Sequence, residues 1–169
     1  MKPSAFAYSA PESLDEALAV LADADGDAKV LAGGQSLLPI LSMRLAAPAL
    51  VVDINRLPDL AYVRSDPEAV VVGALARHAD VERDRAAGDA LPLLGQALRL
   101  VAHPVIRNRG TTVGSLAHAD PSGEMTAVLA LTGGSVTAMS RDGGEREVAL
   151  RRRAGRHVQV LPHSGHVIG

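Results

Sequence analysis

The sequence contains no cysteine and no tryptophan, and its aromatic side chains are one Phe and two Tyr. Without cysteine the chain can form no disulfide, no thiolate metal site, no iron–sulfur ligation and no cysteine nucleophile. So few aromatic rings also leave few surfaces on which the bases of a single-stranded nucleic acid could stack. The chemistry of this chain must therefore rest on its backbone, its hydroxyls and its charged side chains.

Neither sign of charge dominates, since 17 Lys and Arg stand against 19 Asp and Glu. A protein with this balance has no basic field to attract nucleic acid. No apolar run approaches the roughly 20 residues that a membrane span needs, and the N-terminus does not have the layout of a signal peptide. We therefore expect a cytoplasmic protein with no membrane span and no nucleic-acid partner.

The spacing of apolar and turn residues predicts both helices and strands. Ser13 and Glu16 form a capping-box pattern at the start of a helix over about 13–24, in which Glu16 would reach back to the first amide. The remaining predictions are strands at 29–32 and 50–54, a hairpin of 60–63 with 69–73, helices at 80–85, 91–102 and 124–131, and a hairpin of 135–139 with 145–150. Periodicity disappears over 103–121, which predicts a long loop without regular structure.

A glycine-containing bend follows the first of these strands, at Ala32-Gly33-Gly34-Gln35-Ser36-Leu37. Consecutive glycines permit positive φ and remove Cβ atoms, so that several backbone amides can converge on one anion. The Ser36 hydroxyl adds a further donor. An ordinary tight turn at the end of a strand remains the alternative, and neither the Rossmann nor the P-loop glycine pattern is present.

The stretch 106–121 is the second candidate for a binding segment. It contains two glycines, three hydroxyl residues and two arginines. A loop of this length must recover its conformational entropy through something that it holds, and this composition suits a phosphate and a polar ligand. A polar loop between helices is the alternative.

The sequence also contains residues that could form a hydrolase site or a metal site. Ser115, His118 and Asp120 lie close together in sequence, and Ser36 follows glycines, so a small serine hydrolase is an open alternative. No Gly-x-Ser-x-Gly elbow supports it. A metal site of His103, His118 and Asp120 has spacings that match no common ligand motif.

Three stretches together resemble a known family: Lys29 to Pro39, Val72 to Glu82 and Ile106 to Pro121. Their order and separation are similar to those of the FAD-binding medium subunit of the molybdenum hydroxylases, the group of carbon monoxide dehydrogenase and xanthine dehydrogenase. The opening stretch Phe6 to Ala17 is similar as well. The resemblance covers residues 1 to about 150.

This resemblance implies an α+β fold, a two-lobed FAD-binding domain of the vanillyl-alcohol-oxidase or p-cresol-methylhydroxylase type. The first lobe would span 1–55 and an incomplete second lobe 56–150, with an atypical basic tail over 151–169. The implied cofactor is FAD, with Asp120 on its ribityl and isoalloxazine side. The other implied cofactor-binding residues, mainly for the pyrophosphate, are Ala32, Gly33, Gly34, Gln35, Ser36, Leu37, Thr111, Thr112, Val113, Gly114 and Ser115.

The family also implies partners and a role. A large molybdopterin-containing subunit would oxidise the substrate, and a small subunit with two [2Fe-2S] clusters would pass electrons to this FAD and on to an external acceptor. The chain would thus be a flavoprotein oxidoreductase subunit with no catalytic residue or metal ligand of its own. Because the resemblance is expected to end near residue 150, we expect a truncated product with weak or absent FAD binding when alone. A non-catalytic remnant or interaction module without flavin is the alternative.

Overall fold

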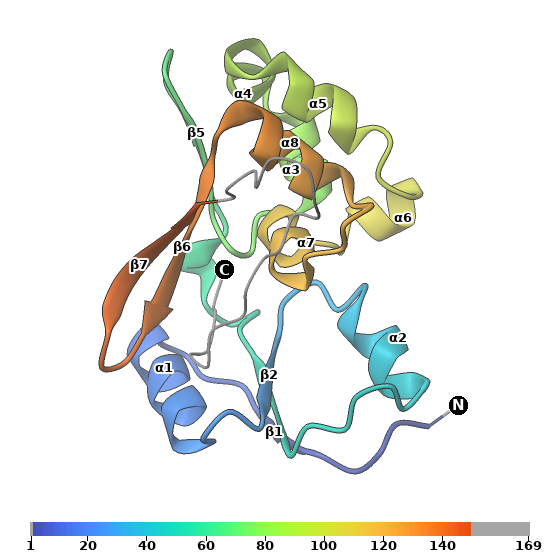
Figure 1. Ribbon diagram of the computed structural model, residues 1–169, viewed down its shortest axis with the longest axis vertical. Helices are drawn as coiled ribbons and strands as arrows, with labels where there is room; N and C mark the ends of the chain where they lie inside the picture. The colour runs from blue at the N-terminus through green and yellow to red at the C-terminus, as the bar shows by residue number, and fades with distance from the viewer. Residues whose placement is uncertain (1, 150–169) are drawn as a thin grey trace, which may run out of the picture.

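The computed structural model describes residues 2–149, arranged as two lobes (Figure 1). The elements of the first lobe are β1 (Ala7–Ser9), α1 (Leu14–Asp23), β2 (Ala28–Leu31), α2 (Leu37–Ser42) and β3 (Leu50–Asp53). A 3-10 turn, η1 (Pro58–Leu60), leads to the second lobe. Its elements are β4 (Val63–Ser65), β5 (Val70–Val72), α3 (His78–Arg83), α4 (Arg85–Ala90), α5 (Pro92–Leu98), α6 (Pro104–Arg107), α7 (Thr112–His118), α8 (Glu124–Thr132), β6 (Ser135–Ser140) and β7 (Gly144–Ala149).

The first lobe is a parallel three-stranded sheet in the order β1-β3-β2, with α1 packed against it (Figure 1). Helix α1 begins where expected, because the Ser13 Oγ accepts the Glu16 amide at 3.2 Å. The Glu16 carboxylate accepts the amide of Glu12 and not that of Ser13. The return hydrogen bond of the capping box therefore goes to the residue before the N-cap. Ala17, Leu18 and Leu21 bury one face of the helix in the core of this lobe.

The second lobe is mainly helical. Helix α5 packs against both α3 and α8, and their apolar side chains form a separate core that includes Leu94, Leu98 and Met125. The hairpin of β6 and β7 extends from this lobe toward α1 (Figure 1), where Met139 packs against the first core. The first core also takes in Leu57 and Leu75, which lie beyond the predicted lobe boundary at residue 55.

The predicted long loop over 103–121 is wrong, because this stretch contains α6 and α7. The Thr111 Oγ1 accepts the Gly114 amide at 3.1 Å and so caps α7. This helix has seven residues with Gly114 among them, and of its residues only the polar Thr112 and the apolar Val113 are buried. A helix so short shows almost no apolar period, which is why the sequence pattern concealed it.

Other predicted elements are present with shifted ends. The helix predicted over 91–102 is α5, which ends at Leu98, and both predicted hairpins form as β4 with β5 and β6 with β7. Within residues 2–149, no helix combines the length and apolar character needed to cross a membrane. The predicted tail over 151–169 lies outside the described residues.

Candidate functional site

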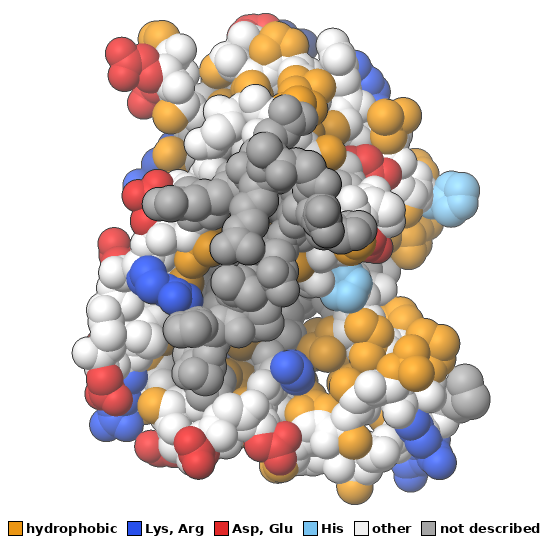
Figure 2. Space-filling model, viewed as in Figure 1, with side chains coloured by type: hydrophobic (Ala, Val, Ile, Leu, Met, Phe, Trp, Pro, Cys, Tyr) orange, Lys and Arg blue, Asp and Glu red, His pale blue; other side chains and the backbone are white. Residues whose placement is uncertain are grey.

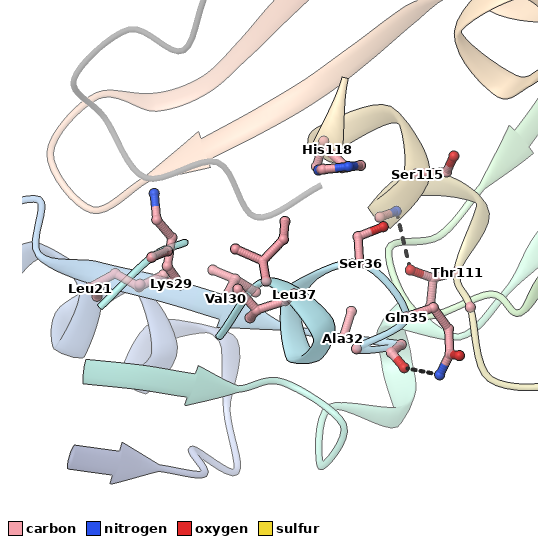
Figure 3. A pocket seen from close by; sticks show the side chains of 18 of the residues that line it. Leu21, Lys29, Val30, Ala32, Gln35, Ser36, Leu37, Thr111, Ser115 and His118 are labelled. Carbon is pink, nitrogen blue, oxygen red and sulfur yellow. Dashed lines mark hydrogen bonds between the residues drawn. The ribbon is translucent and has the colours of Figure 1, made fainter. Parts of the chain in front are cut away.

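A cleft of about 1200 Å³ lies between the two lobes, and residues from both line it. Its first-lobe wall comes from α1, β2 and the segment Ala32–Leu37, and its second-lobe wall includes Thr111, Ser115 and His118. Figure 3 shows Ser36 and His118 at one end of the cleft and Lys29 with Leu21 at the other. Apolar side chains gather over α2 beside the cleft (Figure 2), where Leu38 and Met43 are exposed.

The glycine bend of the first lobe touches the second predicted segment directly. A Cβ placed on Gly33 would lie 2.5 Å from the Arg109 carbonyl oxygen, 2.7 Å from the Gly110 Cα and 2.9 Å from the Thr111 nitrogen. These distances leave no space for any side chain at Gly33. Gly33 and Arg109 are 76 residues apart in sequence, and the two segments therefore meet backbone to backbone at the cleft.

Four consecutive amides of the first segment have no partner in the described part of the chain. The N–H groups of Gly33, Gly34, Gln35 and Ser36 have no hydrogen-bond acceptor among residues 2–149. Gly34 has a φ of +72°, a conformation that favours glycine. The Gln35 side chain donates to the Gly33 carbonyl oxygen at 3.1 Å (Figure 3) and so braces the bend from within. Consecutive free amides of this kind can form an anion-binding concavity.

The second segment offers fewer amides than the resemblance implies. Internal hydrogen bonds take the N–H groups of Thr112, Gly114 and Ser115, at 3.1 Å each. The acceptors are the Ala76 carbonyl for Thr112 and the side chain and carbonyl of Thr111 for the other two. The Thr111 N–H, beside Gly33, has no acceptor within the described part of the chain. Among residues 2–149 the Val113 N–H also has no acceptor, but Val113 is buried and does not line the cleft. Thr111 is therefore the unbonded donor of this segment that lies beside the glycine bend.

The structure brings most, but not all, of the predicted site residues to the cleft. Residues 32–37, Thr111, Gly114 and Ser115 line it. Thr112 and Val113 are buried in the second lobe and do not. Asp120 is exposed and not among the lining residues, and its carboxylate accepts the amide and hydroxyl of Ser122, which lowers the pKa of Asp120. Its role beside the flavin ring stays a prediction.

His78, the first residue of α3, lies buried against the second segment. Its side chain is 4% exposed, and its Nδ1 lies 3.2 Å from the Thr112 Oγ1. Burial lowers the pKa of His78 to about 4, with a further lowering by Arg107 and an opposing effect of Glu124. The imidazole is therefore neutral near pH 7 and packs over Gly110, where an added Cβ would lie 3.0 Å from its Cδ2.

Sequence reasoning missed a pair of side chains outside the two segments, Asn55 and Arg77. The Arg77 guanidinium donates to the Asn55 Oδ1 and to the Arg109 carbonyl oxygen, both at 2.6 Å. The Asn55 Nδ2 donates to the Ala32 carbonyl oxygen at 2.9 Å. Arg77 lies within one of the family-like stretches, which was the available signal, whereas nothing local distinguishes Asn55.

The serine hydrolase alternative finds no catalytic geometry. Within residues 2–149, no hydrogen bond joins Ser36 or Ser115 to His118, and the Asp120 carboxylate is engaged with Ser122. Within residues 2–149, neither serine therefore has a hydrogen-bonded histidine base of the kind that a serine nucleophile needs. The metal-site alternative fails as well, because no group of three His, Cys, Asp or Glu side chains in the described part of the chain could hold an ion.

Comparison with known proteins gives consistent results. Residues 4–164 match a family described as the FAD binding domain in molybdopterin dehydrogenase. The alpha subunit of the 6-hydroxypseudooxynicotine dehydrogenase complex of Paenarthrobacter nicotinovorans is 46% identical over 164 residues, which make up 96% of this chain and 55% of that subunit. The carbon monoxide dehydrogenase medium chain of Hydrogenophaga pseudoflava is 43% identical over 128 residues, 76% of this chain and 45% of that one.

Solved structures agree with these relatives. A structure of carbon monoxide dehydrogenase from Hydrogenophaga pseudoflava, lacking the Mo-pyranopterin moiety of its molybdenum cofactor, is similar with a TM-score of 0.83 and 40% identity. The likeness covers 88% of this chain and 52% of that chain, and it confirms the expected α+β fold. The chain spans about half the length of the curated relatives it matches. The family match runs to residue 164, so the resemblance does not end near 150 as expected.

Proposed function

Because the chain belongs to the family of FAD-binding domains of molybdopterin dehydrogenases, we propose that its cleft binds FAD through the diphosphate. The observation that carries this proposal is the set of amides at Gly33, Gly34, Gln35 and Ser36, which have no acceptor among residues 2–149, together with the contact of Gly33 with the Thr111 nitrogen. A diphosphate needs several donors that no protein acceptor occupies. This part of the cleft fits that need without a lysine or arginine side chain.

The other residues that would hold FAD follow from their place in the cleft. Ser36 and Ser115 present hydroxyls near the same end (Figure 3), and Leu37 with Ala32 contributes apolar surface. Ala32 to Leu37 and Thr111 would therefore hold the diphosphate, with Gly114 and Ser115 alongside. When bound, FAD supplies the redox chemistry, while these residues bind and orient it.

We infer further that the protein acts as a flavin-bearing electron-transfer subunit of a molybdenum-containing hydroxylase or dehydrogenase. It would receive electrons from the iron–sulfur clusters of a small subunit, beside a large molybdopterin-containing subunit, and pass them to an external acceptor. The names of its relatives, which include a medium chain and a subunit of a complex, support this assignment. A place in the cytoplasm stays a prediction of the sequence.

Titration of the purified chain with FAD and with ADP tests the proposed binding. The expectation of weak or absent FAD binding rested on a resemblance that ends near residue 150, and the family match to residue 164 removes that ground. We therefore expect both to bind, and ADP to bind nearly as tightly as FAD, because the contacts identified are directed to the diphosphate. The double variant Gly33→Val/Gly34→Val should abolish binding and retain its helical circular dichroism.

The matched control is Gly88→Val/Gly95→Val, since a Cβ at either of these helical glycines meets nothing within 4 Å. This control should bind ADP as the unaltered chain does. A folded chain that binds neither FAD nor ADP would overturn the proposal and favour the remnant or interaction module. Covalent labelling of Ser36 or Ser115 by a fluorophosphonate would revive the hydrolase instead.

A further inference from the structure

We propose that Asn55 and Arg77 are positioning residues, which hold the glycine bend of the first lobe in the conformation that receives the diphosphate. This inference rests on the proposed function of the cleft. Neither side chain lines the cleft, so neither is expected to touch the ligand. Their effect would pass through the backbone at Ala32, Gly33 and Arg109.

The two side chains form a continuous bridge between the lobes. Arg77, on the second lobe, reaches the Arg109 carbonyl oxygen and the Asn55 Oδ1 at 2.6 Å each. Asn55, just after β3 in the first lobe, reaches the Ala32 carbonyl oxygen at 2.9 Å. Ala32 directly precedes Gly33, and the Arg109 carbonyl oxygen is the atom nearest to the position of a Cβ on Gly33. The bridge thus ties together the two backbone segments that meet at the cleft.

The bridge also fixes the direction of the Gly33 amide. In a planar trans peptide the C=O of one residue and the N–H of the next point in opposite directions. Holding the Ala32 carbonyl toward Asn55 therefore turns the Gly33 N–H away from Asn55. That N–H has no acceptor among residues 2–149, and Gly33 itself lines the cleft.

The orientation of the Asn55 amide is itself determined by its neighbours. Its Nδ2 donates to the Asp53 Oδ1 at 2.6 Å as well as to Ala32, and its oxygen accepts from Arg77. Tyr8 donates to the other Asp53 oxygen at 2.6 Å. Partial burial raises the pKa of Asp53, but hydrogen bonds from Tyr8 and Asn55 outweigh it, so that the pKa is lowered and the carboxylate stays charged.

Packing does not account for either side chain. Asn55 is exposed and Arg77 half-buried, and neither belongs to the apolar cores of the two lobes. Among residues 2–149 the Arg77 guanidinium forms no salt bridge with a carboxylate. Its fork of donors is used to connect a side-chain oxygen with a backbone oxygen, which a lysine cannot reproduce.

The test compares ADP affinity in Arg77→Lys, Asn55→Ala and the double variant. We expect each single variant to bind ADP about tenfold more weakly. Arg77→Lys removes the paired hydrogen bonds of the guanidinium, and Asn55→Ala removes the hydrogen bond to the Ala32 carbonyl oxygen. The double variant should be little weaker than either single variant, because breaking one link already disconnects the bridge. Arg56→Lys is the matched control, because Arg56 is an exposed neighbour whose partner is Glu12.

A second measurement reports the rigidity of the glycine bend in the absence of ligand. The ¹H–¹⁵N heteronuclear NOE of the Gly33 amide should fall in Arg77→Lys and in Asn55→Ala, while that of Gly114 stays unchanged. Unchanged ADP affinity in Arg77→Lys, with binding intact in the unaltered chain, would overturn the positioning role and leave the proposed function standing. An unaltered chain that binds no ADP would overturn the proposed function. In that case the NOE still tests the bridge, and a Gly33 amide that stays rigid in both variants would overturn the positioning role of Asn55 and Arg77.

Discussion

Gly33 is the residue at which the two lobes come into backbone contact. Its missing side chain matters because the nearest atoms are the Arg109 carbonyl oxygen and the Gly110 Cα, which belong to backbone and cannot rotate away. A glycine in a tight turn often serves only to permit positive φ. Here Gly34 has that conformation, while Gly33 allows the close approach.

Substitution of Gly33 by alanine should therefore destabilise the fold. We expect Gly33→Ala to lower the free energy of unfolding by about 1–3 kcal/mol, since the added methyl forces a backbone shift. Urea denaturation measures this change. Gly88→Ala, in the open helical position, should instead raise stability by up to about 1 kcal/mol, and equal effects of the two substitutions would contradict the described contact.

His78 should make stability depend on pH. The pKa of this imidazole is about 4 in the folded chain and near 6.5 when unfolded, because burial disfavours its charged form. The unfolded state therefore binds more protons between these values, and the stability present above pH 6.5 is lost as pH falls toward 4. We expect this residue alone to account for a loss of about 2 kcal/mol between about pH 7.5 and about pH 5.

Denaturation of the unaltered chain and of His78→Asn at both pH values checks this expectation. Asn offers the Thr112 hydroxyl a partner but has no proton to gain. The loss of stability between these two pH values should therefore be smaller in the variant by about 2 kcal/mol. Equal losses in the two proteins would show that the imidazole titrates normally in the fold.

At the scale of single elements, α7 shows how a short helix depends on its cap. Thr111 is 3% exposed, and its Oγ1 accepts the Gly114 amide. Thr126 on α8 is equally buried, yet its Oγ1 has no partner among the described residues. The two threonines differ in hydrogen bonding and not in burial, which makes them a matched pair.

We expect Thr111→Val to lower the free energy of unfolding by about 1 kcal/mol or more, as loss of a helix cap does. Thr126→Val should be neutral or stabilising, because it replaces an unpartnered buried hydroxyl by a methyl group. Thermal or chemical denaturation of both variants gives the comparison. A greater loss from Thr126→Val would mean that its hydroxyl has a partner.

The elements also show how far sequence reasoning reaches. Helix α1 was predictable, since Ser13 caps it and its apolar residues recur at helical spacing. Helix α7 was not predictable, because its two buried residues, Thr112 and Val113, are adjacent in sequence and so show no helical spacing. The glycine bend could be predicted from its composition, but its contact with Arg109 and the bridge through Asn55 depend on residues far apart in sequence, which no local pattern encodes.

At the scale of the whole molecule, two separate apolar cores lie on either side of a cleft. Leu75 and Met139 of the second lobe pack in the first core, and polar contacts of Arg77 add to this junction. The hydrogen bond of Arg77 to Asn55 and the contact of Gly33 with Arg109 and Thr111 join the lobes beside this cleft. The stability of the junction should therefore depend on what fills the cleft.

Hydrogen exchange followed by mass spectrometry tests this dependence. Saturation with ADP should slow amide exchange in both 33–36 and 109–111, because the diphosphate would contact the first segment and Thr111 together. The hairpin of β4 and β5, remote from the cleft lining, serves as internal control. Protection confined to one of the two segments would contradict binding at their junction.

The strand order of the first lobe has a consequence for biosynthesis. β3 is the central strand of the sheet, yet it is the last of the three to be translated, and β1 and β2 pair with it and not with each other. A nascent chain that has not yet extended past residue 49 holds two strands with no neighbour to join. The sheet can then assemble only when β3 leaves the ribosome. Asn55, which binds the Ala32 carbonyl beside the glycine bend, follows β3 by two residues, whereas Arg77 and Arg109 complete the anchorage of the bend only later in synthesis.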